Sequence, residues 1–157
     1  MPAPTIHYFA YGSNLDPVQM QHRCPDHEVV GPAKLEGYRL LFCGNSERWG
    51  GAVATVTPSI DHVVWGVLFR LTEEDLQALD EYEDYRGETN PSTLYDRPEV
   101  RVRTALGVEV PALTYLMRPH AEGKPSRLYL NTITQGAASH GLPREHIAEL
   151  QATPTVD

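Results

Sequence analysis

Residues 7–15 read HYFAYGSNL and set the pattern on which the rest of the chain is built. The first five of them are β-forming residues and predict a strand. The Gly-Ser-Asn at 12–14 then favours a turn. Asp16 followed by Pro17 is typical of a helix start, with an N-cap and a proline at the first helical position, and predicts a short helix at 16–23.

The turn at 12–14 has the character of an anion site. A strand that stops there before a helix leaves several consecutive N–H groups at the end of a sheet, and Gly12 has no Cβ to block a ligand. Such an arrangement can bind a carboxylate or an oxyanion. Ser13 and Asn14 beside Asp-Pro are also ordinary cap and turn residues, so a purely structural turn is the alternative.

Short strands separated by turn residues fill most of the chain, and many alternate Val, Ile, Tyr, Phe or Trp with polar residues. We expect seven such segments: 6–11, 28–37, 38–44, 51–58, 62–71, 95–104 and 108–117, the last two paired across a turn at Gly107. One helix at 72–84 is inserted among them, and two more follow at 126–141 and 143–151. The pattern predicts an α+β fold, a mixed β-barrel of about six strands with a few flanking helices, in a single domain over residues 1–157.

The charge and composition exclude several classes of protein. Thirteen Lys and Arg against 21 Asp and Glu give a net charge of −8, so nucleic acid and anionic membranes are not expected partners. No apolar run approaches the roughly 20 residues of a membrane helix. The opening MPAPTIHYF has no signal-peptide pattern, and we expect a cytoplasmic protein. The two cysteines are too few for a disulfide framework, and no metal ligands have a recognised spacing.

The helix predicted at 72–84 places one acidic residue on its apolar side. At about 100° per residue, Glu83 falls between Leu76 and Leu79, whereas Glu74 and Glu81 fall on the opposite, solvated side. A carboxylate on an apolar face loses hydration, which raises its pKa toward the range of a general acid and base. The alternative is that the helix has ended by residue 83 and the side chain is exposed.

Four stretches together resemble the γ-glutamylcyclotransferase family, in the same order and over nearly the whole chain. They are YFAYGSNL at 8–15, VWGVLFRLTEEDLQALDEYE at 64–83, LTYLM at 113–117 and YLNTITQGAASHGLP at 129–143. The combination of a Tyr-Gly-Ser-Asn loop with a Leu-Asp-x-x-Glu helix end makes the resemblance specific. The family has a mixed α/β barrel, and its enzymes convert γ-glutamyl amino acids or amines into 5-oxoproline and the free amine without a cofactor.

The resemblance implies a role for each matching residue. It makes Glu83 the general acid and base, and it makes the loop of Tyr11, Gly12, Ser13 and Asn14 the binding site of the γ-glutamyl group of a small-molecule substrate. Tyr95, Tyr115 and Tyr129 correspond to pocket tyrosines. The chain departs from the family at Asp84, where many members have glycine, and in the longer link at 84–94.

Two other functions are compatible with the same residues. A non-catalytic binding module on this fold would hold an amino-acid-like ligand without converting it. A hydrolase would let water attack the γ-carbonyl and release free glutamate. The acid at position 83 favours an enzyme over the binding module, and we expect the cyclotransferase. The product, 5-oxoproline or free glutamate, distinguishes it from the hydrolase.

Overall fold

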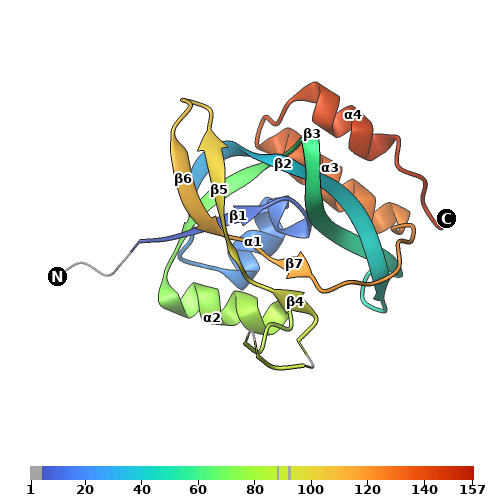
Figure 1. The fold of residues 1–157 in the computed structure, drawn as a ribbon, viewed down its shortest axis with the longest axis horizontal. Coiled ribbons are helices and arrows are strands. Elements are labelled where there is room, and N and C mark those ends of the chain that lie inside the picture. Colours follow the sequence, from blue (N-terminus) through green and yellow to red (C-terminus); the bar gives the residue numbers. More distant parts are fainter. Residues whose placement is uncertain (1–4, 88, 92) are drawn as a thin grey trace.

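The fold is a closed β-barrel flanked by helices, seen in the computed structural model of Figure 1, which describes residues 5–87, 89–91 and 93–157. Residues 1–4 of the opening segment, where no signal peptide is expected, lie outside the described residues. In chain order the elements are β1 (Ile6–Ala10), the 3₁₀ turn η1 (Ser13–Leu15), α1 (Pro17–Arg23), β2 (Glu28–Ser46), β3 (Gly51–Leu71), α2 (Glu73–Tyr82), β4 (Tyr95–Asp96), β5 (Glu99–Thr104), β6 (Glu109–Leu113), β7 (Leu116–Met117), α3 (Arg127–Ser139) and α4 (Arg144–Gln151).

The barrel has the strand order β1-β3-β2-β5-β6 and closes where β6 meets β1. The closing pair is parallel, with Tyr8 opposite Leu113, and the other pairs are antiparallel. The expected mixed barrel of an α+β fold is therefore confirmed. The strand count differs slightly: within the described residues five strands form the barrel, and β4 and β7 form a separate pair.

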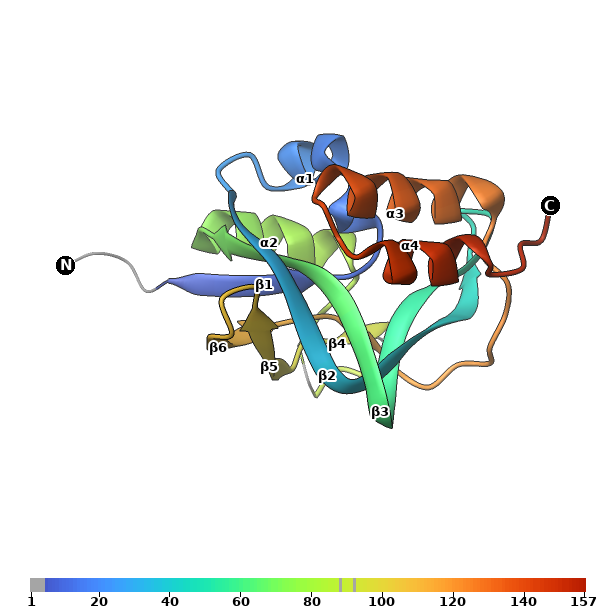
Figure 2. The ribbon, with the colours of Figure 1, turned by 90° about the horizontal axis from the view of Figure 1, so that it is seen from above.

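The difference in strand count arises first in β2 and β3, because each merges two segments that we expected to be separate strands. The ladder pairs Glu36 with Val63 and then Tyr38 with Pro58, so Gly37 and residues 59–62 bulge out between these pairs. The turn-forming residues there bend a continuous ladder and do not end it. Figure 2 shows the two long strands curving together across the molecule.

The segments at 95–104 and 108–117 are each divided in two. Pro98, which has no N–H to donate, lies between β4 and β5, and its carbonyl accepts from Thr114 N–H at 3.1 Å. The halves next to the predicted turn at Gly107 form the barrel hairpin β5–β6. The halves farther from this turn pair as β4–β7. This division takes Tyr95 and Tyr115 out of the regular barrel ladder.

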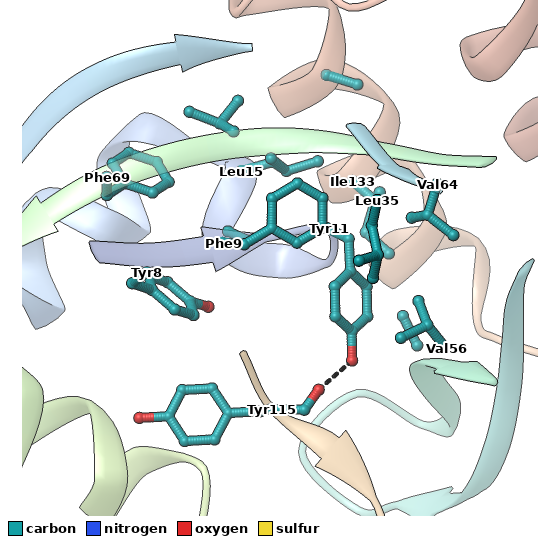
Figure 3. Close-up of a cluster of buried hydrophobic side chains, with 14 of the residues drawn as sticks. Tyr8, Phe9, Tyr11, Leu15, Leu35, Val56, Val64, Phe69, Tyr115 and Ile133 are labelled. Carbon is teal, nitrogen blue, oxygen red and sulfur yellow. Dashed lines mark hydrogen bonds between the residues drawn. The ribbon is translucent and has the colours of Figure 1, made fainter. Parts of the chain in front are cut away.

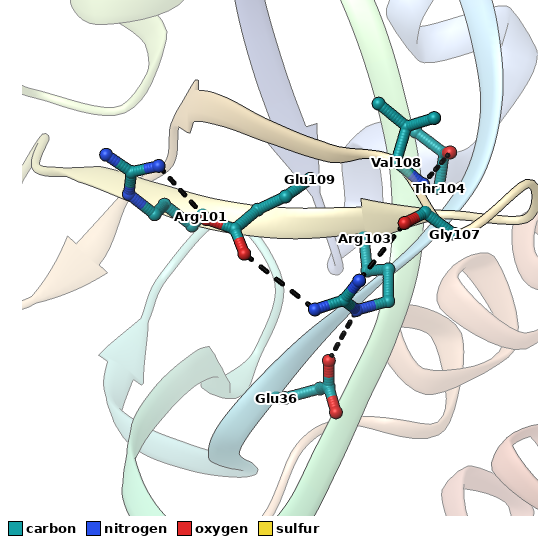
Figure 4. A network of polar contacts seen from close by, with 7 residues as sticks. All are labelled: Glu36, Arg101, Arg103, Thr104, Gly107, Val108 and Glu109. Atoms are coloured by element: carbon teal, nitrogen blue, oxygen red, sulfur yellow. Dashed lines mark hydrogen bonds and ion pairs between the residues drawn. The ribbon is translucent and has the colours of Figure 1, made fainter.

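A polar network on the outer surface supports the short contact of β5 with β2, which pairs at Ala33–Thr104 and Lys34–Arg103. The Arg103 guanidinium donates to the Glu36 carboxylate at 3.0 Å and to the Gly107 carbonyl at 3.1 Å (Figure 4). Exposed ion pairs of this kind contribute about 0–1 kcal/mol each to stability. The network therefore adds little to the free energy of folding, and its main effect is on the register of β5 against β2.

The core fills the space between the barrel and the helices. Figure 3 shows Phe9, Leu15, Val64, Phe69 and Ile133, each at most 1% exposed, packed between β1, β3 and α3. Burying large apolar side chains to this degree provides most of the folding free energy. The core thereby fixes the end of β1, where the predicted turn begins.

Helix α3 lies directly against η1. A Cβ on Gly136 would stand 2.5 Å from the Leu15 carbonyl carbon, so only glycine permits this approach. In Figure 2, α1, α3 and α4 run along one side of the barrel, opposite β5 and β6. The described part of the chain contains no helix with the length and apolar character needed to cross a membrane.

Candidate active site

A cavity of about 260 Å³ opens between the end of β1, the end of α2 and the β2–β3 connection. Small-molecule sites typically measure roughly 300–1,000 Å³, so this cavity suits a small ligand. Every site residue expected from the sequence lines it: Tyr11, Gly12, Ser13, Asn14, Glu83, Tyr95, Tyr115 and Tyr129. The structure thus brings together groups that are up to 118 residues apart in the chain.

The turn after β1 lines the cavity and contains backbone donors that the fold does not use. The N–H groups of Leu15 and Asp16 are used, because they donate to the carbonyls of Gly12 and Ser13 at 3.0 Å each. The N–H groups of Gly12, Ser13 and Asn14 make no hydrogen bond to the other described residues. They are therefore free to bind a carboxylate or an oxyanion in the cavity.

Glu83 lies at the C-cap of α2, one residue beyond the helix, so the predicted end at residue 84 is slightly late. Its N–H still donates to the Leu79 carbonyl at 2.9 Å, which keeps the side chain on the apolar side of the helix. The carboxylate accepts from Asn14 Nδ2 at 3.2 Å. Burial raises the pKa of Glu83 to about 7, against the opposing charge of Arg23.

Asp84 has a left-handed backbone with φ +55°, immediately after the C-cap. Glycine is the usual residue in that conformation, and aspartate is among those that tolerate it. Its carboxylate pairs with Arg86 at 3.0 Å. Asp84 therefore serves the chain reversal after α2.

The predicted tyrosines form a wall of neutral phenols. Tyr11 donates to the Tyr115 carbonyl, as Figure 3 shows, and Tyr129 Oη accepts from Ala54 N–H at 2.8 Å. The rings of Tyr95 and Tyr115 meet edge to face at 6.4 Å. Burial raises the pKa of all four phenols well above 10, so they remain hydrogen-bond donors at physiological pH.

Two residues that orient Asn14 were not predicted from the sequence, although both lie in or near the quoted motifs. Tyr8 lines the cavity, and its hydroxyl accepts from Asn14 Nδ2 at 2.8 Å. Arg23 donates to Asn14 Oδ1 from the end of α1. These bonds fix the orientation of the Asn14 amide, so its Nδ2 faces Glu83. On β1 successive side chains point to opposite faces, so Tyr8 lies on the face opposite to Phe9. This alternation was the signal in the sequence that could have identified Tyr8.

A second group that the sequence did not reveal surrounds Asp80, the aspartate of the Leu-Asp-x-x-Glu motif. Asp80 accepts from the Tyr115 hydroxyl at 2.7 Å and pairs with Arg97. The Arg97 guanidinium also lies 4.7 Å from the centre of the Tyr85 ring. Asp80 thus positions a cavity tyrosine from α2, the helix that precedes Glu83.

The rim beside Glu83 carries two arginines on one aromatic ring. The guanidinium carbons of Arg23 and Arg48 lie 3.4 and 4.2 Å from the centre of the Tyr82 ring. Trp49, next to Arg48, packs against Tyr129, with ring centres 4.9 Å apart and ring planes tilted by 55°. Across the described ranges, no three His, Cys, Asp or Glu side chains are grouped so that they could hold a metal ion.

The site belongs to a chain that is similar to known proteins over nearly its full length. The family model described as gamma-glutamyl cyclotransferase, AIG2-like, matches residues 8–134. The chain belongs to this family. The predicted membership of the γ-glutamylcyclotransferase family, a family of enzymes, is thereby confirmed.

Individual members of the γ-glutamylcyclotransferase family are similar to the chain in sequence and in fold. It is 37% identical over 153 residues to a gamma-glutamylcyclotransferase of Mus musculus, covering 94% of this chain and 78% of the mouse protein. The Homo sapiens protein of that name is 36% identical over 150 residues, covering 92% and 77%. A solved structure titled gamma-glutamyl cyclotransferase has a TM-score of 0.91 at 33% identity, covering 98% of this chain and 90% of that one.

Proposed function

We propose that this protein cyclises a γ-glutamyl compound to 5-oxoproline and releases the amine or amino acid. Glu83 is the general acid and base, and the Tyr11–Asn14 loop binds the γ-glutamyl group. The observation that supports this most strongly is the shared cavity: a carboxylate with a pKa of about 7 and a turn with unused backbone N–H groups line one space of small-molecule size. The names of the mouse and human relatives agree with this reaction.

The reaction begins with a proton transfer. The α-ammonium group of the substrate gives a proton to the Glu83 carboxylate and becomes a nucleophilic amine. The amine nitrogen then bonds to the γ-carbonyl carbon of the same molecule, closing a five-membered ring. Because nucleophile and carbonyl belong to one chain, the cavity needs only to hold that chain bent.

The negative charge that develops on the γ-carbonyl oxygen needs donors that are already in place. The N–H groups of Gly12, Ser13 and Asn14 can supply them, since they are not used within the fold. Protonated Glu83 then returns its proton to the leaving nitrogen as the original amide bond breaks. The ring nitrogen still carries two protons and passes one to the departing amine. The products are therefore 5-oxoproline and the amine in its ammonium form, and Glu83 is again ionised.

Product analysis separates the three candidate functions. Purified protein incubated with a panel of γ-glutamyl amino acids and γ-glutamylamines should release 5-oxoproline, detected by mass spectrometry. Free glutamate in place of 5-oxoproline would show a hydrolase. Calorimetric binding without any product would show a binding module, and either result would contradict the proposal.

The pH dependence of the reaction should report the Glu83 carboxyl. Only the ionised form accepts the first proton, so kcat/KM is expected to fall about tenfold per pH unit below roughly pH 7. This midpoint follows from the pKa of about 7, raised above 4.5 by burial. Initial rates between pH 5 and 9, with circular dichroism at each pH as a control for folding, measure it. A midpoint near 4.5 would place the carboxyl in water.

A further inference from the structure

Arg48 lies in the connection between β2 and β3, on the rim of the cavity. Its side chain is exposed, and its guanidinium lies over the Tyr82 ring, the residue before Glu83. Arg48 makes no hydrogen bond or ion pair with any other described residue. Its charge is therefore available to an anion that enters the cavity.

The other charged groups nearby already have partners. Arg23 on the same ring is bonded to Asn14 Oδ1, and Asp84 on the rim is paired with Arg86. Glu83 accepts from Asn14 inside the cavity. Among the described residues that line the cavity, Arg48 is thus the cation with donors to spare.

The position of Arg48 matches the side from which the amine departs. In the proposed reaction the γ-glutamyl group occupies the inner part of the cavity, between the loop and Glu83. The scissile nitrogen must face Glu83, so the group attached to it extends toward the rim of Arg48 and Trp49. Arg48 is close enough for its charge to oppose the rise in the pKa of Glu83.

We propose that Arg48 is a specificity-determining residue that binds the α-carboxylate of the leaving amino acid. The substrates would then be γ-glutamyl α-amino acids rather than γ-glutamyl derivatives of amines without a neighbouring carboxylate. This inference rests on the proposed function. In such substrates the carboxylate is on the carbon next to the scissile nitrogen, which places it at the rim when that nitrogen faces Glu83.

Arginine is suited to this task for two physical reasons. Its planar guanidinium can donate two parallel hydrogen bonds to one carboxylate. Stacking on Tyr82 also holds the guanidinium in place before the substrate arrives, which lowers the entropy lost on binding. Lysine would keep the charge but lose the paired donors.

The experiment compares two substrates that differ only in the group Arg48 should recognise. These are γ-glutamyl-alanine and γ-glutamyl-alaninamide, in which an uncharged amide replaces the α-carboxylate. For the wild-type protein, kcat/KM for the acid should exceed that for the amide about 10- to 100-fold, as for a hydrogen-bonded charge pair. In Arg48→Gln this ratio should fall to near one, chiefly through KM, and Arg48→Lys should keep part of it.

Arg70→Gln is the matched control. Arg70 on β3 is also an exposed arginine, but it pairs with Glu28 on β2 and does not line the cavity. This variant should keep the wild-type ratio. A wild-type ratio near one, or an equal loss for both substrates in Arg48→Gln, would overturn the inference. The second result would mean that Arg48 binds the γ-glutamyl group itself. If neither compound gives 5-oxoproline, the proposed function fails as well, so the two failures are distinguishable.

Discussion

Replacing Glu83 with glutamine is expected to lower the rate of 5-oxoproline release about 10²- to 10⁴-fold, the usual contribution of a general acid and base. Glutamine has nearly the same shape, and its amide oxygen can still accept from Asn14 Nδ2. It cannot take a proton from the substrate amine or return one to the leaving nitrogen. The loss should therefore appear in kcat, measured under saturating γ-glutamyl substrate.

The control for this substitution is Glu81→Gln, which changes an exposed glutamate on the same helix and should keep wild-type turnover. Folding of the Glu83 variant is not at risk. Because burial raises the pKa of Glu83, the wild type loses stability as the pH rises from 4.5 through about 7, whereas neutral glutamine does not. The variant should thus melt at a higher temperature than the wild type at pH 8. Unchanged turnover would remove Glu83 from the mechanism.

The Gly136→Ala protein should be less stable than the wild type by about 1–3 kcal/mol, with a melting temperature lower by roughly 3–10 °C. Helix propensity alone predicts the opposite, a gain of about 0.5–1 kcal/mol inside a helix. The clash decides the sign, since a new Cβ would lie 2.5 Å from the Leu15 carbonyl carbon and 2.7 Å from Asp16 N. To relieve it, α3 must move away from η1, the turn that carries Asn14.

Activity should fall together with stability in this variant, because displacement of η1 moves the N–H donors away from Glu83. Gln135→Ala is the control: it adds alanine to the exposed face of the same helix and should change the free energy of unfolding by less than about 0.5 kcal/mol. Thermal denaturation and kcat/KM would be measured for both proteins. A stabilised Gly136→Ala variant would mean that helix and turn do not touch as described.

The sequence predicted best those features that depend on residues close together in the chain. Asp16 and Thr72 are confirmed as N-caps, accepting from Val18 N–H at 3.3 Å and Asp75 N–H at 3.1 Å, because a cap depends only on residues within one turn. The unusual place of Glu83 also followed from a helical period. Its role as acid and base stays a prediction until the substitution is made.

Long-range contacts were beyond the reach of such patterns. Nothing local to Asp80 indicates that its carboxylate meets the Tyr115 hydroxyl, 35 positions along the chain. The contact of Arg48 with Tyr82 could not be predicted either, because an arginine between two predicted strands is common and only the folded barrel places it on the Tyr82 ring. The bend of β2 and β3 was also missed, because Gly37 and Pro58 favour a strand end as much as a bulge.

In the proposed mechanism, the tip of the long β2–β3 hairpin contacts the leaving group, and other elements carry the residues that transfer the proton. The tip carries Arg48 and Trp49, whereas Glu83 follows directly after α2 and Asn14 stands on η1, which packs against α3. Variation at the tip can therefore retune substrate choice while Glu83 and Asn14 are kept. Evolutionary divergence among relatives of this chain should concentrate in that short segment, and laboratory evolution of new amine preferences can begin there.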